Sequence, residues 1–142
     1  MSVGSSTTDP LISRLLEDGS KKNMIFVAPV GNQPLQETVV FPASHPDVLA
    51  VAGLTDIGKP YPNSVVAKLA VAQAPATNVL VAVPEQAHRF LNGTSMASAT
   101  VAGLIAIAWE RNRKINMERL PFFDGNICKW GEDLLETEIC DE

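Results

Sequence analysis

The sequence contains few cysteines and few basic residues, and each shortage excludes a class of protein. Its two cysteines, Cys128 and Cys140, are too few for a disulfide framework, and no CxxC or Cys/His spacing predicts a metal site. One bridge between them and two reduced thiols are both compatible with the sequence. Eleven basic residues against sixteen acidic ones give a formal net charge of -5. We therefore expect no nucleic-acid partner, because phosphate binding needs clustered Lys and Arg.

Long apolar runs are also missing. The longest one, from Val101 to Trp109, is too short to cross a bilayer, so we expect no membrane span. The opening residues MSVGSSTTDP have neither the basic start nor the apolar stretch of a signal peptide, and the sequence predicts no compartment.

What is present is the composition of one globular domain, 142 residues long and 46% hydrophobic. Asp9 followed by Pro10 predicts the capped start of a helix, and Gly19 predicts its end. The apolar residues of this helix fall on one face: Leu11, Ile12, Leu15 and Leu16.

Further along, apolar runs predict strands at 24–28, 48–53, 65–72 and 79–83, with an extended segment at 39–42. Nearly continuous runs such as MIFVA are typical of strands buried on both faces. A long helix is expected from Thr94 or Ser95 to about Asn112, and 132–139 has the pattern of a short acidic helix. This order predicts an α/β layered fold with a mainly parallel sheet.

Ser95 stands at the predicted start of the long helix, two residues after Gly93. A hydroxyl there lies beside the free N–H groups at the positive end of the helix dipole, and such N–H groups can stabilise an oxyanion. An ordinary Ser/Thr helix cap explains the same residues, and taken alone the local pattern favours the cap.

Three other residues are candidates for chemistry. Asn32 follows a predicted buried strand, where active-site groups of open α/β sheets gather, although Gly-Asn is also a common turn pair. His45 lies between two prolines, and His88 lies in PEQAHRF, in an expected loop before Ser95. Either histidine has the chemistry of a general base for a serine, but an ordinary surface-loop histidine is the stronger interpretation of both.

Several segments together resemble the subtilisin-like serine peptidases. GTSMAS, followed two residues later by VAG, is similar to the family's nucleophile motif, with Ala99 in place of the usual proline. IFVAPVGN resembles the strand that ends in the oxyanion asparagine, and FPASHPDVLAVAG resembles the next strand. Ala74-Pro75 and MSVGS resemble a later strand and the substrate-binding edge strand. The resemblance covers residues 1 to 113 in the family's own order and implies its three-layer fold.

The resemblance also implies roles for individual residues. Ser95 would be the nucleophile, and Asn32 would donate its side-chain amide to the oxyanion. The residues implied to bind a peptide substrate are Ser2, Val3 and Gly4 by β-pairing, and Val30 and Val40 near the specificity pocket. Because Val40 replaces what is often glycine, we expect a shallow pocket that prefers small side chains. The family often binds calcium and is often secreted, but no ligand set is assigned, and no metal or cofactor is predicted here.

The family's Asp and His motifs lie upstream of the edge strand, and neither is found there: no His-Gly-Thr occurs, and the one Asp-x-Gly, at 56–58, comes after that strand. His45 and His88 align with non-catalytic positions. Residues 1–113 are therefore expected to be the C-terminal half of a catalytic domain without its first strands, followed by a tail at 114–142. Such a chain would be almost inactive alone, with the N-terminal half as a partner beside the peptide substrate. One alternative is a non-catalytic, peptide-binding relative. A nucleotide-binding domain using the Gly93 turn is a remote one, because the GxGxxG pattern and the P-loop lysine are missing.

Overall fold

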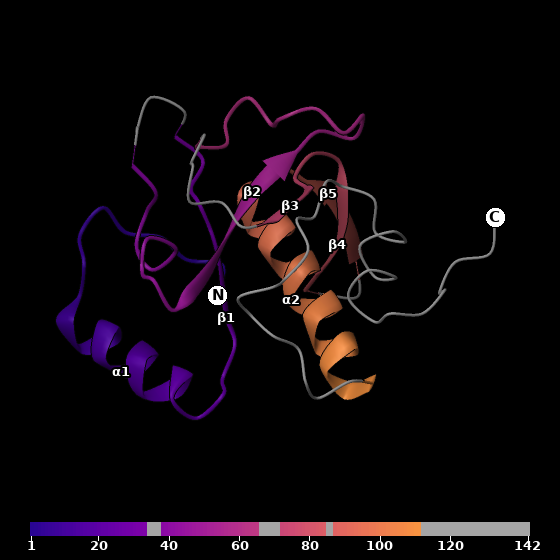
Figure 1. Ribbon diagram of the computed structural model, residues 1–142. Coiled ribbons are helices and arrows are strands. Elements are labelled where there is room, and N and C mark those ends of the chain that lie inside the picture. Colours follow the sequence, from indigo (N-terminus) through magenta and orange to yellow (C-terminus); the bar gives the residue numbers. More distant parts are fainter. Residues whose placement is uncertain (34–37, 66–71, 85–86, 112–142) are drawn as a thin grey trace.

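The computed structural model describes residues 1–33, 38–65, 72–84 and 87–111. The elements in these ranges are α1 (Pro10–Ser20), β1 (Phe26–Pro29), β2 (Val48–Leu54), β3 (Ala72–Pro75), β4 (Val79–Val83), β5 (Ala87–Leu91) and α2 (Thr94–Arg111). Figure 1 shows β2 between the two helices.

The sheet β1-β2-β3 is parallel and separates two hydrophobic cores. Along β2, Leu49 and Val51 belong to the core under α2, whereas Val48 and Ala50 belong to the core that contains Leu16 of α1. Because both faces of the sheet are covered here, every residue of β2 is buried. The predicted α/β fold with a mainly parallel sheet is confirmed.

The first helix begins where the sequence predicts. One carboxylate oxygen of Asp9 accepts hydrogen bonds from two backbone N–H groups of the first turn, at 2.8 and 3.0 Å, as an N-cap does. The helix ends at Ser20, one residue beyond the predicted Gly19. Of its apolar face only Leu16 is buried, because it alone points into the core against the sheet. The exposed residues are Leu11, Ile12 and Leu15.

The strands predicted at 48–53 and 79–83 are present as β2 and β4, and β1 lies slightly later than the predicted 24–28. Most of the candidate strand at 65–72 falls in residues 66–71, outside the described residues, and β3 begins at Ala72. The expected short helix at 132–139 and the whole tail at 114–142 also lie outside them.

The expected loop around His88 is wrong. Residues 87–91 form β5, which pairs antiparallel with β4 so that His88 lies opposite Ala82. The sequence gives no signal for this strand. Every residue of β5 is exposed, so AHRFL does not alternate between apolar and polar residues as a half-buried strand does.

Candidate functional site

A cavity of about 370 Å³ lies where the carboxyl end of β1 meets the first turn of α2. Polar groups often gather at this position in open α/β sheets. The lining residues come from the N-terminal segment, from the loop after β1, and from the start of α2: Ser2, Val3, Gly4, Ser5, Ser6, Pro29, Gly31, Asn32, Gln33, Val40, Thr94 and Ser95. The cavity thus brings together six of the seven residues to which the resemblance assigns a role.

Ser95 is the second residue of α2 and lines this cavity. Gly93 makes the turn into the helix with φ +144°, a conformation that a residue with a side chain rarely adopts. The Gly93 N–H donates to the carbonyl of Ala76 at 2.7 Å, which ties this turn to the end of β3. The hydroxyl of Ser95 is therefore held at the N-terminus of a helix, beside N–H groups that the helix itself does not use.

The side chain of Asn32 is held in one orientation by Thr94. The backbone N–H of Thr94 donates to Asn32 Oδ1 at 2.8 Å, and its hydroxyl donates to the same oxygen at 2.9 Å. Because the carbonyl end of the amide receives both bonds, Nδ2 remains a donor for the cavity that Asn32 lines. This arrangement provides two N–H donors near Ser95, the amide of Asn32 and the backbone of the helix start.

Thr94 belongs to this candidate site, although the sequence patterns do not single it out. Its side chain is fully buried, and both of its donors are used on Asn32. The only signal in the sequence is its place directly before Ser95 in GTSMAS, where it reads as an ordinary cap.

The segment of Ser2, Val3 and Gly4 is exposed along one wall of the cavity. It is fixed just beyond its end, where Ser5 and Phe41 exchange backbone hydrogen bonds of 2.7 and 2.9 Å. At its start, the Ser2 hydroxyl donates to the carbonyl of Ser95 at 3.3 Å. An extended, exposed segment of this kind is a suitable surface for β-pairing with a peptide.

Val40 occupies the space between two glycines of the cavity wall. A Cβ atom added at Gly4 would lie 2.6 Å from Val40 Cγ2, and one added at Gly31 would lie 3.0 Å from Val40 Cγ1. Gly31 also has a positive φ of 108°. The side chain of Val40 therefore leaves room only for glycine at these two positions. It also makes the cavity shallower at this point.

Val30 lies between two residues of the cavity wall, Pro29 and Gly31, and its carbonyl accepts a hydrogen bond from the Val40 N–H at 3.2 Å. Its side chain is fully buried in the core that contains Leu16, and it does not line the cavity. The alternation of side chains along an extended segment gives the reason: Val30 follows Ala28 by two residues and points to the same side. Pro29 and Gly31 line the cavity instead.

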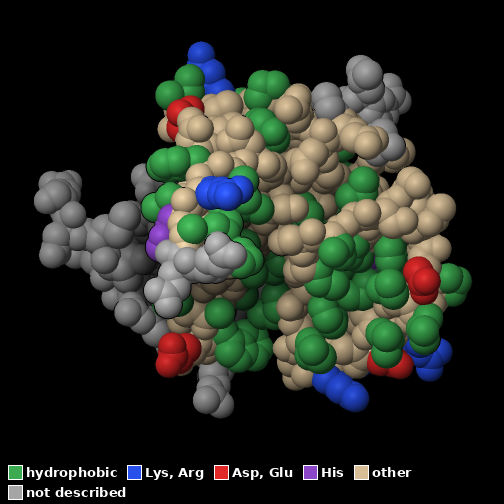
Figure 2. All heavy atoms as spheres, turned by 180° about the vertical axis from the view of Figure 1, so that it is seen from behind, with side chains coloured by type: hydrophobic (Ala, Val, Ile, Leu, Met, Phe, Trp, Pro, Cys, Tyr) green, Lys and Arg blue, Asp and Glu red, His purple; other side chains and the backbone are tan. Residues whose placement is uncertain are grey.

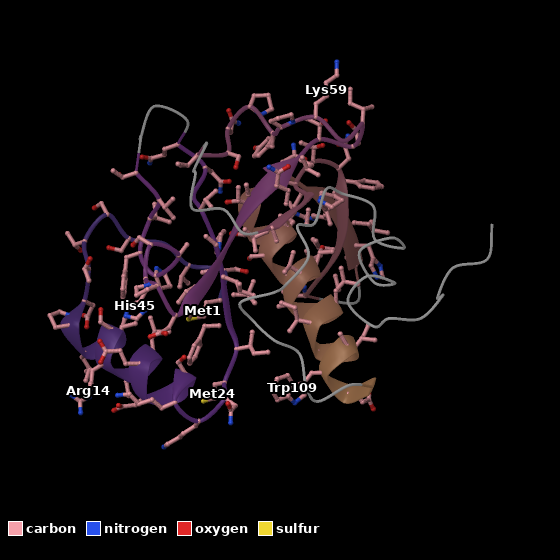
Figure 3. All side chains as sticks on the ribbon, viewed as in Figure 1. Met1, Arg14, Met24, His45, Lys59 and Trp109 are labelled. Carbon is pink, nitrogen blue, oxygen red and sulfur yellow. The ribbon has the colours of Figure 1, made fainter. Side chains whose placement is uncertain are left out.

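Neither histidine of the chain reaches the cavity. His45 lies near α1 (Figure 3), where its Nδ1 accepts from the backbone N–H of Asp47 at 3.2 Å. His88 lies on exposed β5. Among the described residues that line the cavity there is no imidazole and no carboxylate, so none of these groups supplies a base to Ser95.

The described ranges contain no group of three or more His, Cys, Asp or Glu side chains arranged to hold a metal ion. Within the same ranges, neither helix combines the length and apolar character needed to cross a membrane.

Comparisons with known proteins agree on one family. The model of the subtilase family, Peptidase_S8, matches residues 1–121. The chain is 34% identical to subtilisin DY of Bacillus licheniformis over 112 residues, which are 75% of this chain and 40% of the relative. It is 24% identical to subtilisin NAT of Bacillus subtilis subsp. natto over 148 residues, covering 97% of this chain and 39% of that protein.

Solved structures give the same result. The prenylagaramide maturation protease PagA matches with a TM-score of 0.70 and 29% identity, over 76% of this chain and 41% of that one. The self-cleaved protease domain of PatA matches with a TM-score of 0.72 and 28% identity, over 80% of this chain and 46% of that one. The chain spans about two fifths of the length of the curated relatives it matches.

Proposed function

The chain belongs to the subtilase family, and we propose that it carries the nucleophile and the oxyanion donors of a subtilisin-type serine endopeptidase. Residues 1–113 would form the C-terminal half of the catalytic domain, and 114–142 a tail. The observation that carries this proposal is the Thr94–Asn32 contact, which turns an amide donor toward the cavity that holds Ser95.

In the proposed reaction, a general base takes the proton of the Ser95 hydroxyl as its oxygen attacks the carbonyl carbon of a peptide bond. The C–N bond then breaks, the amine leaves with that proton, and water hydrolyses the remaining acyl-enzyme. Negative charge develops on the carbonyl oxygen during the attack. The Asn32 Nδ2 and the backbone N–H of Ser95 would donate hydrogen bonds to it. In subtilisin itself, loss of the oxyanion asparagine lowers turnover about 10²–10³-fold.

The substrate is a protein or peptide in extended form. Its backbone would pair with the exposed segment of Ser2, Val3 and Gly4, and the side chain before the cleaved bond would enter the cavity beside Val40. Because Val40 fills the space between Gly4 and Gly31, small side chains are expected to fit best.

The general base is proposed to come from the N-terminal half of the domain. The chain has only two histidines, and both lie away from the cavity. The 142 residues alone are therefore expected to be almost inactive. In subtilisin, removing the serine or the histidine lowers turnover about 10⁶-fold, which sets the scale of this loss.

A non-catalytic, peptide-binding subtilase relative is the second candidate. The exposed segment from Ser2 to Gly4 and the absence of a base in the described cavity favour it. An experiment can distinguish the two candidates. Peptide binding needs no general base and therefore requires only the 142 residues, whereas hydrolysis requires the base as well.

The test is a fused enzyme, in which the part of subtilisin DY that precedes its matched segment is joined to residue 1 of this chain. The endopeptidase proposal predicts hydrolysis of small-residue peptides by the fused enzyme and none by its Ser95→Ala variant. A folded, soluble fused enzyme without hydrolysis would contradict it. If the chain alone then binds such peptides, and Gly4→Val weakens binding, the non-catalytic candidate is supported.

A further inference from the structure

The entry turn of α2, residues 92–94, leads to Ser95 directly after the β4–β5 hairpin. In the described ranges, β4 and β5 form a sheet of only two strands, separate from β1-β2-β3, and every residue of β5 is exposed. Isolated two-stranded ribbons are marginally stable in water. The position of Ser95 therefore depends on how the base of this hairpin is held.

The hairpin is not held by a hydrophobic core. None of its described residues belongs to either of the two cores beside the sheet. Figure 2 shows many hydrophobic side chains at the surface on one face of the molecule. The larger exposed ones of the hairpin are Leu80, Phe90 and Leu91. Since these side chains are not packed, the hairpin needs another kind of anchor.

Hydrogen bonds at the base of the hairpin provide this anchor. The β3–β4 turn, residues 76–78, lies on one side of the base, and the entry turn lies on the other. The Gly93 N–H donates to the carbonyl of Ala76 at 2.7 Å, and the Asn92 Oδ1 accepts from the backbone N–H of Asn78 at 2.7 Å. The entry turn is therefore placed only as well as the β3–β4 turn.

The β3–β4 turn is fixed in its own right by the loop after β2. The Ala76 N–H donates to the carbonyl of Leu54 at 2.7 Å, and the Asp56 N–H donates to the Thr77 hydroxyl at 2.9 Å. A third bond joins two side chains, because Asn78 Nδ2 donates to Asp56 Oδ2 at 3.0 Å. Leu54 is the buried last residue of β2, so this loop starts from the packed sheet.

Asn78 joins the two sets of contacts. Its φ of 53° is left-handed, a conformation that asparagine adopts more readily than most other residues. In this conformation its backbone N–H reaches Asn92, and its side chain reaches Asp56. A hydrogen bond to a carboxylate is stronger than one between neutral groups. Asp56 is thus linked to the entry turn through a single residue.

We propose that Asp56 is a positioning residue for Ser95, because its carboxylate holds the entry turn of α2 in place through Asn78 and Asn92. Asp56 is not among the described residues that line the cavity, so it acts only through this link. The inference rests on the proposed function, which makes the Ser95 N–H an oxyanion donor. A displaced entry turn would misplace that donor and the hydroxyl together, and would lower kcat rather than raise KM.

The first test breaks the Asp56–Asn78 bond from either side in the fused enzyme. Asp56→Ala removes the acceptor, and Asn78→Gly removes the donor while glycine keeps the left-handed backbone. Each should lower kcat about threefold with KM unchanged, because one hydrogen bond is lost. Asp56→Asn keeps an oxygen that can accept the bond and should restore most of kcat. Ile57→Ala is the matched control, since it changes an exposed neighbour in the same loop and should leave kcat unchanged.

A double-mutant cycle tests whether the two residues act through the same bond. If they do, Asp56→Ala should lower kcat no further in a chain that already carries Asn78→Gly. Fully multiplicative losses in the double variant would overturn the inference. So would a wild-type kcat for Asp56→Ala, or a change in KM in place of the change in kcat.

Hydrogen exchange of the 142-residue chain tests the same link without hydrolysis. The Gly93 amide donates to Ala76, and it should exchange about threefold faster in Asp56→Ala than in the wild type or Asp56→Asn. The Val30 amide, which donates to Val51 beside the sheet at 3.0 Å, is the control and should exchange at the same rate in all three. Equal exchange at Gly93 in Asp56→Ala and wild type would overturn the inference.

The two measurements separate this inference from the proposed function. If the fused enzyme folds but hydrolyses no peptide, the peptidase proposal fails, whereas faster exchange at Gly93 in Asp56→Ala still supports the hold of Asp56 on the entry turn. If the fused enzyme is active and Asp56→Ala changes neither kcat nor exchange at Gly93, the role of Asp56 fails and the peptidase proposal stands.

Discussion

The two ends of α2 are built differently. In its first two turns Thr94, Ala97, Ser98 and Val101 are buried, and the small side chains allow close contact with the sheet. Toward its C-terminal end, Ile105 and Ala108 are still buried, but Ile107 is 51% exposed. One end of the same helix is thus packed and hydrogen-bonded, while the other presents apolar surface.

This difference shows which parts of the site the chain forms by itself. At the packed end, Thr94 positions Asn32 through contacts within these 142 residues. Within the described ranges, no buried side-chain nitrogen or oxygen lacks a hydrogen-bond partner. The geometry of the proposed oxyanion donors therefore needs no second chain, whereas the general base is proposed to come from outside.

The largest effect is expected at the packed end. Asn32→Leu in the fused enzyme should lower kcat about 10²–10³-fold with little change in KM, because the lost donor acts on charge that develops in the transition state. Steady-state hydrolysis of a small-residue peptide measures it. Asn63→Leu, an exposed asparagine away from the cavity, is the control, and equal kinetics of the two variants would contradict the proposed role of Asn32.

A pair of truncations compares the two ends directly. Val101→Ala in the fused enzyme should lower the free energy of unfolding by about 2 kcal/mol, since it removes buried methyl groups and leaves a cavity. Ile107→Ala should change it by less than about 0.5 kcal/mol, as is usual for exposed positions. Urea unfolding gives both values. A larger loss for Ile107→Ala would mean that the open end is covered in the fused enzyme.

The cavity wall provides a test of specificity. Val40→Gly should raise kcat/KM for peptides with a bulky side chain before the cleaved bond by about tenfold or more, relative to small ones, because it empties the space between Gly4 and Gly31. A peptide library cleaved by both fused enzymes measures the preference. If the unmodified fused enzyme already favours bulky residues, Val40 does not limit the cavity.

The smallest effect concerns the orientation of Asn32. Thr94→Val removes one of two hydrogen bonds to Asn32 Oδ1 and should lower kcat about tenfold with KM unchanged. Thr94→Ser keeps the hydroxyl and should restore most of kcat. If Thr94 has a purely structural role, Thr94→Val and Thr94→Ser should lower the free energy of unfolding equally. Thr94→Ser should then fail to restore kcat.

Much of the fold was predictable because its signals are local. The signals for the apolar runs at 48–53 and 79–83 and for the Asp9-Pro10 helix start come from neighbouring residues, and all three elements are present. Strand β5 was not predictable, because both of its faces meet solvent and its sequence does not alternate.

The site was predictable only in part, for a related reason. Motifs locate Ser95 and Asn32, but the bond from Thr94 to Asn32 joins residues 62 positions apart and depends on the folded sheet. The burial of Val30 depends on the extended alternation continuing past Pro29, which no local pattern reveals. Likewise, whether Leu11 and Leu15 are covered depends on what lies against α1, not on their spacing.

The most direct test of the account is the reaction of Ser95 with a fluorophosphonate, which labels serines activated for attack. Mass spectrometry locates the adduct after equal exposure of the 142-residue chain and of the fused enzyme. The account predicts an adduct on Ser95 in the fused enzyme and almost none in the chain alone. Labelling of Ser95 at the same rate in both, or no labelling of a folded fused enzyme, would contradict it.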